Sequence, residues 1–210
     1  MNKIFFFLVI TVTSTSLYSQ VNVDFSRENH TIKSLVDSLI HGGCVSVSNI
    51  TFKRKKGKKE LEGNDQQIGY FTDANSSLGF ASGIALSTGH VDEIDGHPTN
   101  KAEYEWEKSK KSKKFGDLDL DIIVSPYKTQ DAATLEFDFI PQSDSIQFDY
   151  VFLSEEYPEF VCTNYNDAFA FIISGPGITD DPGLTGKNIA LIPGTTDPVS
   201  INTVNHGDPS

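Results

Sequence analysis

The chain has 210 residues, a formal net charge of −12 and two cysteines. This length suits one sizeable domain with a hydrophobic core of its own. The acidic balance argues against a nucleic-acid-binding protein, because such a surface repels phosphate.

Residues 1–19 have the pattern of a secretory signal peptide. Lys3 precedes an apolar run, Ile4 to Val12, that is too short to span a bilayer, and small polar residues follow it. No later segment reaches the ~20 apolar residues of a membrane helix. We therefore expect a protein that is secreted or held at the outer cell surface, with no integral membrane segment after signal removal.

Residues 20–43 form a lead that contains one helical pattern, and the main domain is expected at 44–210. Asn29 or Thr31 can cap the start of the helix, and Gly42 with Gly43 can end it. The apolar residues repeat at helical spacing: Ile32, Leu35, Val36, Leu39 and Ile40. We expect this helix to pack against the domain that follows.

Downstream of Gly43 the hydrophobic period changes to two, which is typical of half-buried strands. The alternating runs occupy residues 44–52, 134–140, 146–152 and 167–174, with shorter ones at 188–194 and 198–205. They predict a mainly β fold, an antiparallel β-sandwich of jelly-roll type. We expect Leu135, Phe148 and Phe169 to share its interior.

Two basic runs, at residues 53–59 and 108–114, hold eleven of the seventeen Lys and Arg residues. Such runs can bind anionic polymers, but they are more often solvated loop tips, which is the interpretation favoured here. Residues 89–115 are polar and poorly patterned, so they are expected to form a long surface loop.

Several ordered segments resemble the bacterial choice-of-anchor L domain from about Val45 onward. They are GIALSTG (83–89), GDLDLD (116–121), residues 131–161, NDAFAFIISGPG (166–177), NIALIPGT (188–195) and VSINTVN (199–205). The resemblance implies an exported surface module of Gram-negative bacteria. In different members the domain is joined to different anchoring or sorting tails, including those of type IX secretion. The family has no agreed biochemical activity.

The family's domains continue beyond the segment that corresponds to VSINTVN, whereas this chain ends at Ser210. We therefore expect a domain that is incomplete at its C-terminal end and lacks its anchoring tail. A naturally short member of the family, whose sheet edge is covered in another way, is the alternative.

An acidic loop follows the run at 146–152 and contains Glu155 and Glu156. Adjacent residues of an extended chain point to opposite sides, so these two cannot together be a catalytic pair. Either of them with Asp167 offers the two carboxyl groups that glycoside hydrolysis needs. A further interpretation is structural, in which Tyr157 anchors the loop and a glutamate accepts main-chain N–H bonds.

Calcium is the sharper hypothesis for these carboxylates, because it takes six to eight oxygen ligands from irregular loops. Asp117, Asp119 and Asp121 alternate, so we expect them on one side of an extended segment. Together with the acidic loop, the candidate ligands are Asp117, Asp119, Asp121, Glu155, Glu156, Asn166 and Asp167. Solvated acidic turns are the alternative.

The two cysteines, Cys44 and Cys162, are expected to form a disulfide, because an exported protein meets an oxidising compartment. Two buried reduced thiols are the alternative.

These patterns predict a non-catalytic extracellular binding or adhesion module, stabilised by calcium, whose ligand is a carbohydrate or a surface protein. The alternatives are a surface polysaccharide hydrolase that uses Glu155 or Glu156 with Asp167, and a structural spacer.

Overall fold

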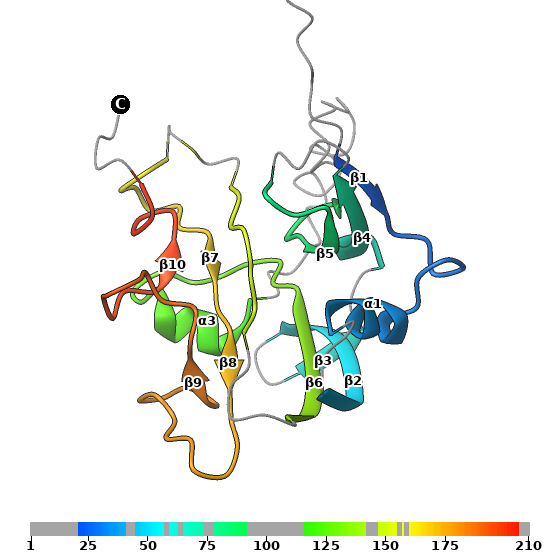
Figure 1. The fold of residues 1–210 in the computed structure, drawn as a ribbon. Helices are drawn as coiled ribbons and strands as arrows, with labels where there is room; N and C mark the ends of the chain where they lie inside the picture. Colours follow the sequence, from blue (N-terminus) through cyan, green and yellow to red (C-terminus); the bar gives the residue numbers. More distant parts are fainter. Residues whose placement is uncertain are drawn as a thin grey trace, which may run out of the picture.

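A computed structural model describes residues 21–40, 45–56, 59–62, 65–73, 78–91, 116–141, 147–154, 157 and 160–205. Over these residues the chain is mainly β, with antiparallel sheets and few helices (Figure 1). The expected signal peptide, the second basic run and most of the expected surface loop at 89–115 lie outside the described residues.

The first sheet joins β1 (Val21–Asp24), β4 (Ile68–Asp73) and β5 (Ser82–Leu86), with β4 in the centre and antiparallel to both neighbours. A short 3-10 turn at Asp65–Gln67 leads into β4. One hydrophobic cluster lies here and contains Val21, Phe71, Ala85 and Val91.

Helix α1 (Ile32–Leu39) follows the first strand and contacts both β5 and β2. It begins at Thr31, whose side-chain oxygen accepts a hydrogen bond from Ser34 N at 3.1 Å, as an N-cap does. Its apolar face buries Leu35 in a second cluster with Phe52 and Ile68. The helix therefore fastens the first sheet to the second.

The second sheet has the order β3-β2-β6, from β3 (Lys59–Glu62), β2 (Val45–Lys56) and β6 (Thr134–Pro141). The first basic run is not a simple loop tip, because most of it lies in β2 and β3. In the antiparallel register Lys53 is the partner of Glu62, and Lys55 is the partner of Glu60. The register therefore places basic residues of β2 directly opposite the two glutamates of β3.

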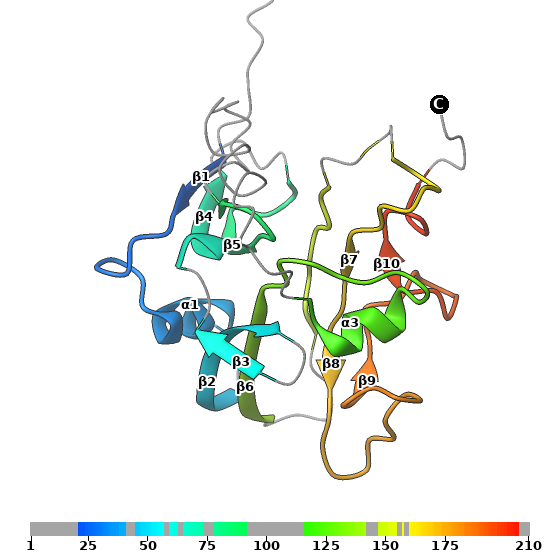
Figure 2. The ribbon, with the colours of Figure 1, turned by 180° about the vertical axis from the view of Figure 1, so that it is seen from behind.

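Two short antiparallel pairs complete the described structure. They are β7 (Ala168–Phe169) with β10 (Val199–Ser200), and β8 (Ile172–Ile173) with β9 (Lys187–Asn188). In both ribbon views the segment 147–154 runs between β6 and the β7–β8 stretch (Figures 1 and 2).

The strand expected at 146–152 is not formed over its described residues. The side chains nevertheless align the segment antiparallel to β7 and β8. Phe148 stacks on Phe171 with ring centroids 4.7 Å apart, and Tyr150 lies 4.9 Å from Phe169. The alternation therefore predicted the side-chain contacts correctly but not the main-chain ladder.

The contacts of the described residues do not confirm that Leu135, Phe148 and Phe169 share one interior. Leu135 packs against the cluster of Leu35 and Phe52, whereas Phe148 and Phe169 contact other aromatic rings. Among the described residues no ring contact or buried cluster joins the two groups, so the face-to-face sandwich stays a prediction.

Candidate functional site

The GDLDLD segment forms a helix, α3 (Leu118–Ile123), and the expected extended conformation is wrong. The cause is Asp117, which caps the helix. Its Oδ1 accepts hydrogen bonds from Asp119 N at 2.9 Å and Leu120 N at 3.3 Å. Residues two apart on a helix do not face each other, so the three aspartates cannot line one side.

Asp119 joins α3 to the loop that precedes β9. Its carboxylate is buried and accepts two hydrogen bonds from Thr185, from the main-chain N at 3.0 Å and from Oγ1 at 2.6 Å. Figures 1 and 2 both show α3 beside β8 and β9. Asp119 therefore fastens the helix to the β8–β9 pair.

Asp121 fixes the segment that follows α3 in the sequence. Its Oδ1 accepts hydrogen bonds from Thr129 N at 2.7 Å and Thr129 Oγ1 at 2.8 Å, and Lys128 Nζ lies 3.2 Å from Oδ2. Burial raises the pKa of Asp121, but the hydrogen bonds from Thr129 and the charge of Lys128 outweigh burial and hold it below 3.8. The carboxylate is therefore kept ionised as a structural acceptor.

The acidic loop is anchored by Tyr157, as the structural interpretation expected. Its hydroxyl donates a hydrogen bond to the carbonyl of Val204. Burial raises the pKa of Tyr157, and the negative charge of Asp167 raises it further. The Asp167 carboxylate in turn accepts a hydrogen bond from Ser154 Oγ at 2.7 Å. Glu155 and Glu156 lie outside the described residues.

Asn202 holds the rest of this loop and was missed by the sequence analysis. Its Oδ1 accepts from Cys162 N at 2.7 Å, its Nδ2 donates to Thr163 O at 3.4 Å, and its own N–H donates to Asn166 Oδ1 at 3.1 Å. Ile201 N adds a bond to the Asp167 carbonyl at 3.0 Å. We call residues 160–167, held in this way, the clamped loop. The sequence offered no signal for it, because Asn202 lay inside the alternating run expected at 198–205.

The predicted calcium ligands therefore fall into two groups. Asp117, Asp119 and Asp121 belong to α3, while Asn166 and Asp167 belong to the clamped loop. In Figures 1 and 2, α3 lies beside β8 and β9 at one end of β7, and residues 160–166 lie at the other end of β7. Within the described ranges, no three His, Cys, Asp or Glu residues gather closely enough to hold a metal ion. Calcium binding stays a prediction.

Cys162 lies in the clamped loop with an exposed, free thiol, and Cys44 is outside the described residues. The disulfide between them stays a prediction.

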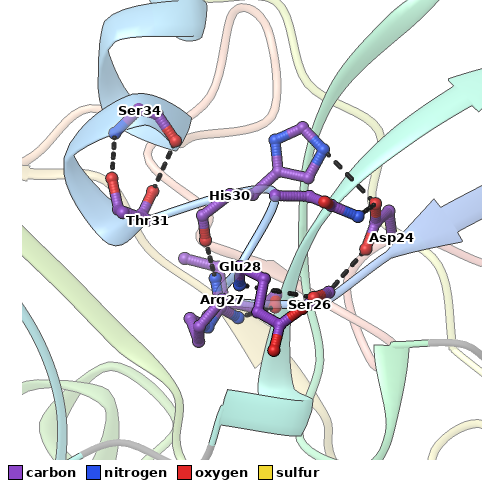
Figure 3. Close-up of polar contacts among 9 residues, drawn as sticks. Asp24, Ser26, Arg27, Glu28, His30, Thr31 and Ser34 are labelled. Atoms are coloured by element: carbon purple, nitrogen blue, oxygen red, sulfur yellow. Dashed lines mark hydrogen bonds and ion pairs between the residues drawn. The ribbon is translucent and has the colours of Figure 1, made fainter.

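A second polar cluster, also missed from sequence, shapes the connection from β1 to α1 (Figure 3). The Asp24 carboxylate accepts from Asn29 Nδ2 and Ser26 N, both at 2.8 Å, and lies 3.6 Å from His30 Nε2. The hydrogen bond from Asn29, then that from Ser26, lowers the pKa of Asp24, and the charges of His30 and Arg27 lower it further. Arg27 donates to the carbonyls of His30 and Ile68. These bonds tie the connection to β4.

Taken together, the described residues form an antiparallel β domain in which polar side chains hold the loops in place. A family model described as the Choice-of-anchor L domain matches residues 21–210. The chain belongs to this family, which confirms the resemblance and implies an exported surface protein. No curated protein and no solved structure matches the chain.

The described part of the chain contains no helix long and apolar enough to cross a membrane.

Proposed function

We propose that the chain is a non-catalytic module of the outer cell surface that binds or adheres to a carbohydrate or another surface protein. Family membership supports the surface location. The non-catalytic part of the proposal is supported by the hydrogen bonds that Asp167 accepts in the acidic loop. Asp167 accepts a hydrogen bond through its carboxylate from Ser154 and another through its carbonyl from Ile201. These bonds suit a group that holds a loop in shape.

The competing hypothesis is a surface polysaccharide hydrolase with Glu155 or Glu156 and Asp167 as its two carboxyl groups. Such a pair must lie about 5 to 10 Å apart and face one substrate. The hydrogen bond from Ser154 favours the structural role of Asp167 over this one.

Binding is tested by presenting the purified chain to an array of glycans and, separately, to immobilised bacterial surface proteins. The proposal expects retention on one of these surfaces without chemical change of the bound molecule. Retention on neither surface would leave the structural spacer as the function and would overturn the proposal.

The proposal includes a stabilising calcium ion. Its seven candidate ligands form two separate sets, Asp117, Asp119 and Asp121 on α3 and Glu155, Glu156, Asn166 and Asp167 in and beside the acidic loop, so one ion would use one set only. Support comes from the chemistry of each set, because carboxylate and amide oxygens are the donors that calcium prefers. If calcium binds, titrating it into chelator-treated protein will raise the melting temperature, since a ligand of the folded state stabilises it. No rise at millimolar calcium, with magnesium as the control, contradicts this part.

The predicted sandwich belongs to the same proposal. The row of rings that joins segment 147–154 to β7 and β8 supports it, because aromatic side chains are aligned there as on one face of a sheet.

A further inference from the structure

Two aromatic side chains of the clamped loop, Phe160 and Tyr165, are exposed although they contact each other. Their ring centroids are 4.9 Å apart and their planes are inclined by 66°, so the rings form an open corner. Phe160 is 41% exposed and Tyr165 is 59% exposed. Large apolar groups left in water next to one another are a common mark of a binding surface.

The main chain between the two rings is held by short-range hydrogen bonds. Thr163 donates twice to the Phe160 carbonyl, from N at 3.1 Å and from Oγ1 at 2.6 Å. Tyr165 N then donates to Thr163 Oγ1 at 3.2 Å. Between the rings, Val161 is buried and anchors the turn in the interior. The main-chain positions that carry the two rings are therefore held before any ligand arrives.

Cys162 shows that this loop conformation is imposed by its surroundings. Its φ is +61°, a left-handed conformation that costs a residue with a Cβ about 1 to 2 kcal/mol. Such a conformation persists where neighbouring contacts over-determine it, and here Asn202 accepts the Cys162 N–H. A loop that is rigid in advance loses less conformational entropy on binding.

The chemistry of the corner selects the ligand. The face of an aromatic ring carries partial negative charge, which attracts the C–H groups on the flat side of a sugar ring. Asn164, exposed between the two rings in sequence, adds amide donors and acceptors for hydroxyl groups. The formal charge of −12 disfavours uronic or sulfated sugars. A protein interface needs ~20–30 residues on each side, far more than two rings supply.

We infer that the Phe160–Tyr165 corner is a binding site for a neutral pyranose unit of a glycan. This inference rests on the proposed function and names the ligand class and the residues that bind it. Asn202 is a positioning residue, because it holds the loop without contributing to the ring surface.

The test is an array of neutral hexose and N-acetylhexosamine oligosaccharides, with uronic and sulfated oligosaccharides for comparison, followed by calorimetry with the strongest binder. Tyr165→Ala and Phe160→Ala are each expected to weaken binding about tenfold. Tyr165→Phe keeps the ring and should stay close to the original affinity. Tyr150→Ala is the matched control, since this ring is also exposed but packs on Phe169.

Asn202→Ala separates positioning from contact. It retains both rings and should still weaken binding, while melting curves report whether each variant is folded.

Three results would overturn the inference. They are no binding to any neutral oligosaccharide, stronger binding to the charged ones, and binding that folded Tyr165→Ala and Phe160→Ala variants leave unchanged. In the last case the chain still binds a glycan, so the proposed function stands and only the site is wrong. If the chain binds a surface protein but no glycan, the proposed function stands and the glycan site is wrong. If it binds neither a glycan nor a surface protein, the proposed function and the glycan site are both wrong.

Discussion

At the scale of single residues, aspartates in this chain act mainly as acceptors that join segments distant in sequence. Asp119 reaches Thr185, and Asp121 reaches Thr129. The sequence showed the carboxylates but not their partners, because a threonine 66 positions away leaves no local pattern. From the sequence, the spacing of Asp117, Asp119 and Asp121 suggested a bound cation. In the structure these carboxylates accept hydrogen bonds from N–H and O–H groups of the protein.

Asp119 gives the clearest prediction at this scale. Replacing it with alanine leaves Thr185 N and Oγ1 without their acceptor inside the protein, so the free energy of unfolding should fall by about 1–3 kcal/mol. Urea denaturation measures the loss. Asp37→Ala, at an exposed position of α1 where Asp37 pairs with the exposed Lys33, should change stability by less than about 0.5 kcal/mol. Equal losses in the two variants would contradict the role given to Asp119.

Asp121 predicts a pH dependence. Its pKa in the folded protein lies below the usual 3.8, so the carboxylate contributes stability above that pH. The contribution is lost as the pH falls through the lowered pKa, because the proton then binds the folded state less readily than the unfolded one. Asp121→Asn should therefore lower stability at neutral pH and flatten its decline in acid.

Denaturation midpoints from about pH 6 to pH 2 test this expectation. A decline just as steep in the Asp121→Asn variant would show that the groups responsible lie elsewhere, for example at Asp24, whose pKa is also lowered.

At the scale of elements, the long apolar patterns were informative and the short ones were not. The stripe from Ile32 to Ile40 coincides with α1, which the structure places at Ile32–Leu39. Helix α3 was missed because its six residues are too few to show a helical period, and its alternating Asp and Leu imitate a strand. Its only local signal was the capping aspartate, Asp117.

Two leucines of α1 test the packing of that helix. Leu35 is fully buried beside Phe52 and Ile68, whereas Leu39 on the next turn is 41% exposed. Leu35→Ala should cost ~2–5 kcal/mol, since it leaves a cavity as well as losing buried surface. Leu39→Ala should cost much less. If chemical denaturation gives similar losses for both, the helix does not pack as described.

At the scale of the whole molecule, the sequence correctly predicted a mainly β domain with antiparallel pairing and membership of the choice-of-anchor L family. It did not predict which elements the individual apolar side chains contact. Leu135 packs against the cluster that contains Leu35 of α1. The ring of Phe148 contacts Phe171, and the ring of Phe169 contacts Tyr150. Alternation tells which residues of a strand share a face, but it carries no information on which element covers that face.

The clamped loop illustrates the same limit for the candidate site. Its aromatic and acidic residues are evident in the sequence. The hydrogen bonds from Cys162 N to Asn202 and from Tyr157 to the Val204 carbonyl arise only when residues 202–204 fold against the loop. Sequence patterns therefore located the loop without revealing that it is held from outside.

The proposed function requires that the acidic loop holds a ligand-binding surface in shape and carries out no reaction. The direct measurement is the release of reducing ends from a set of bacterial and plant polysaccharides by the wild-type chain and by the Glu156→Gln and Asp167→Asn variants, with melting temperatures recorded alongside. We predict no release by any of the three proteins and a lower melting temperature for Asp167→Asn, which weakens the acceptor of Ser154. Release by the wild type that either folded variant abolishes would contradict the account.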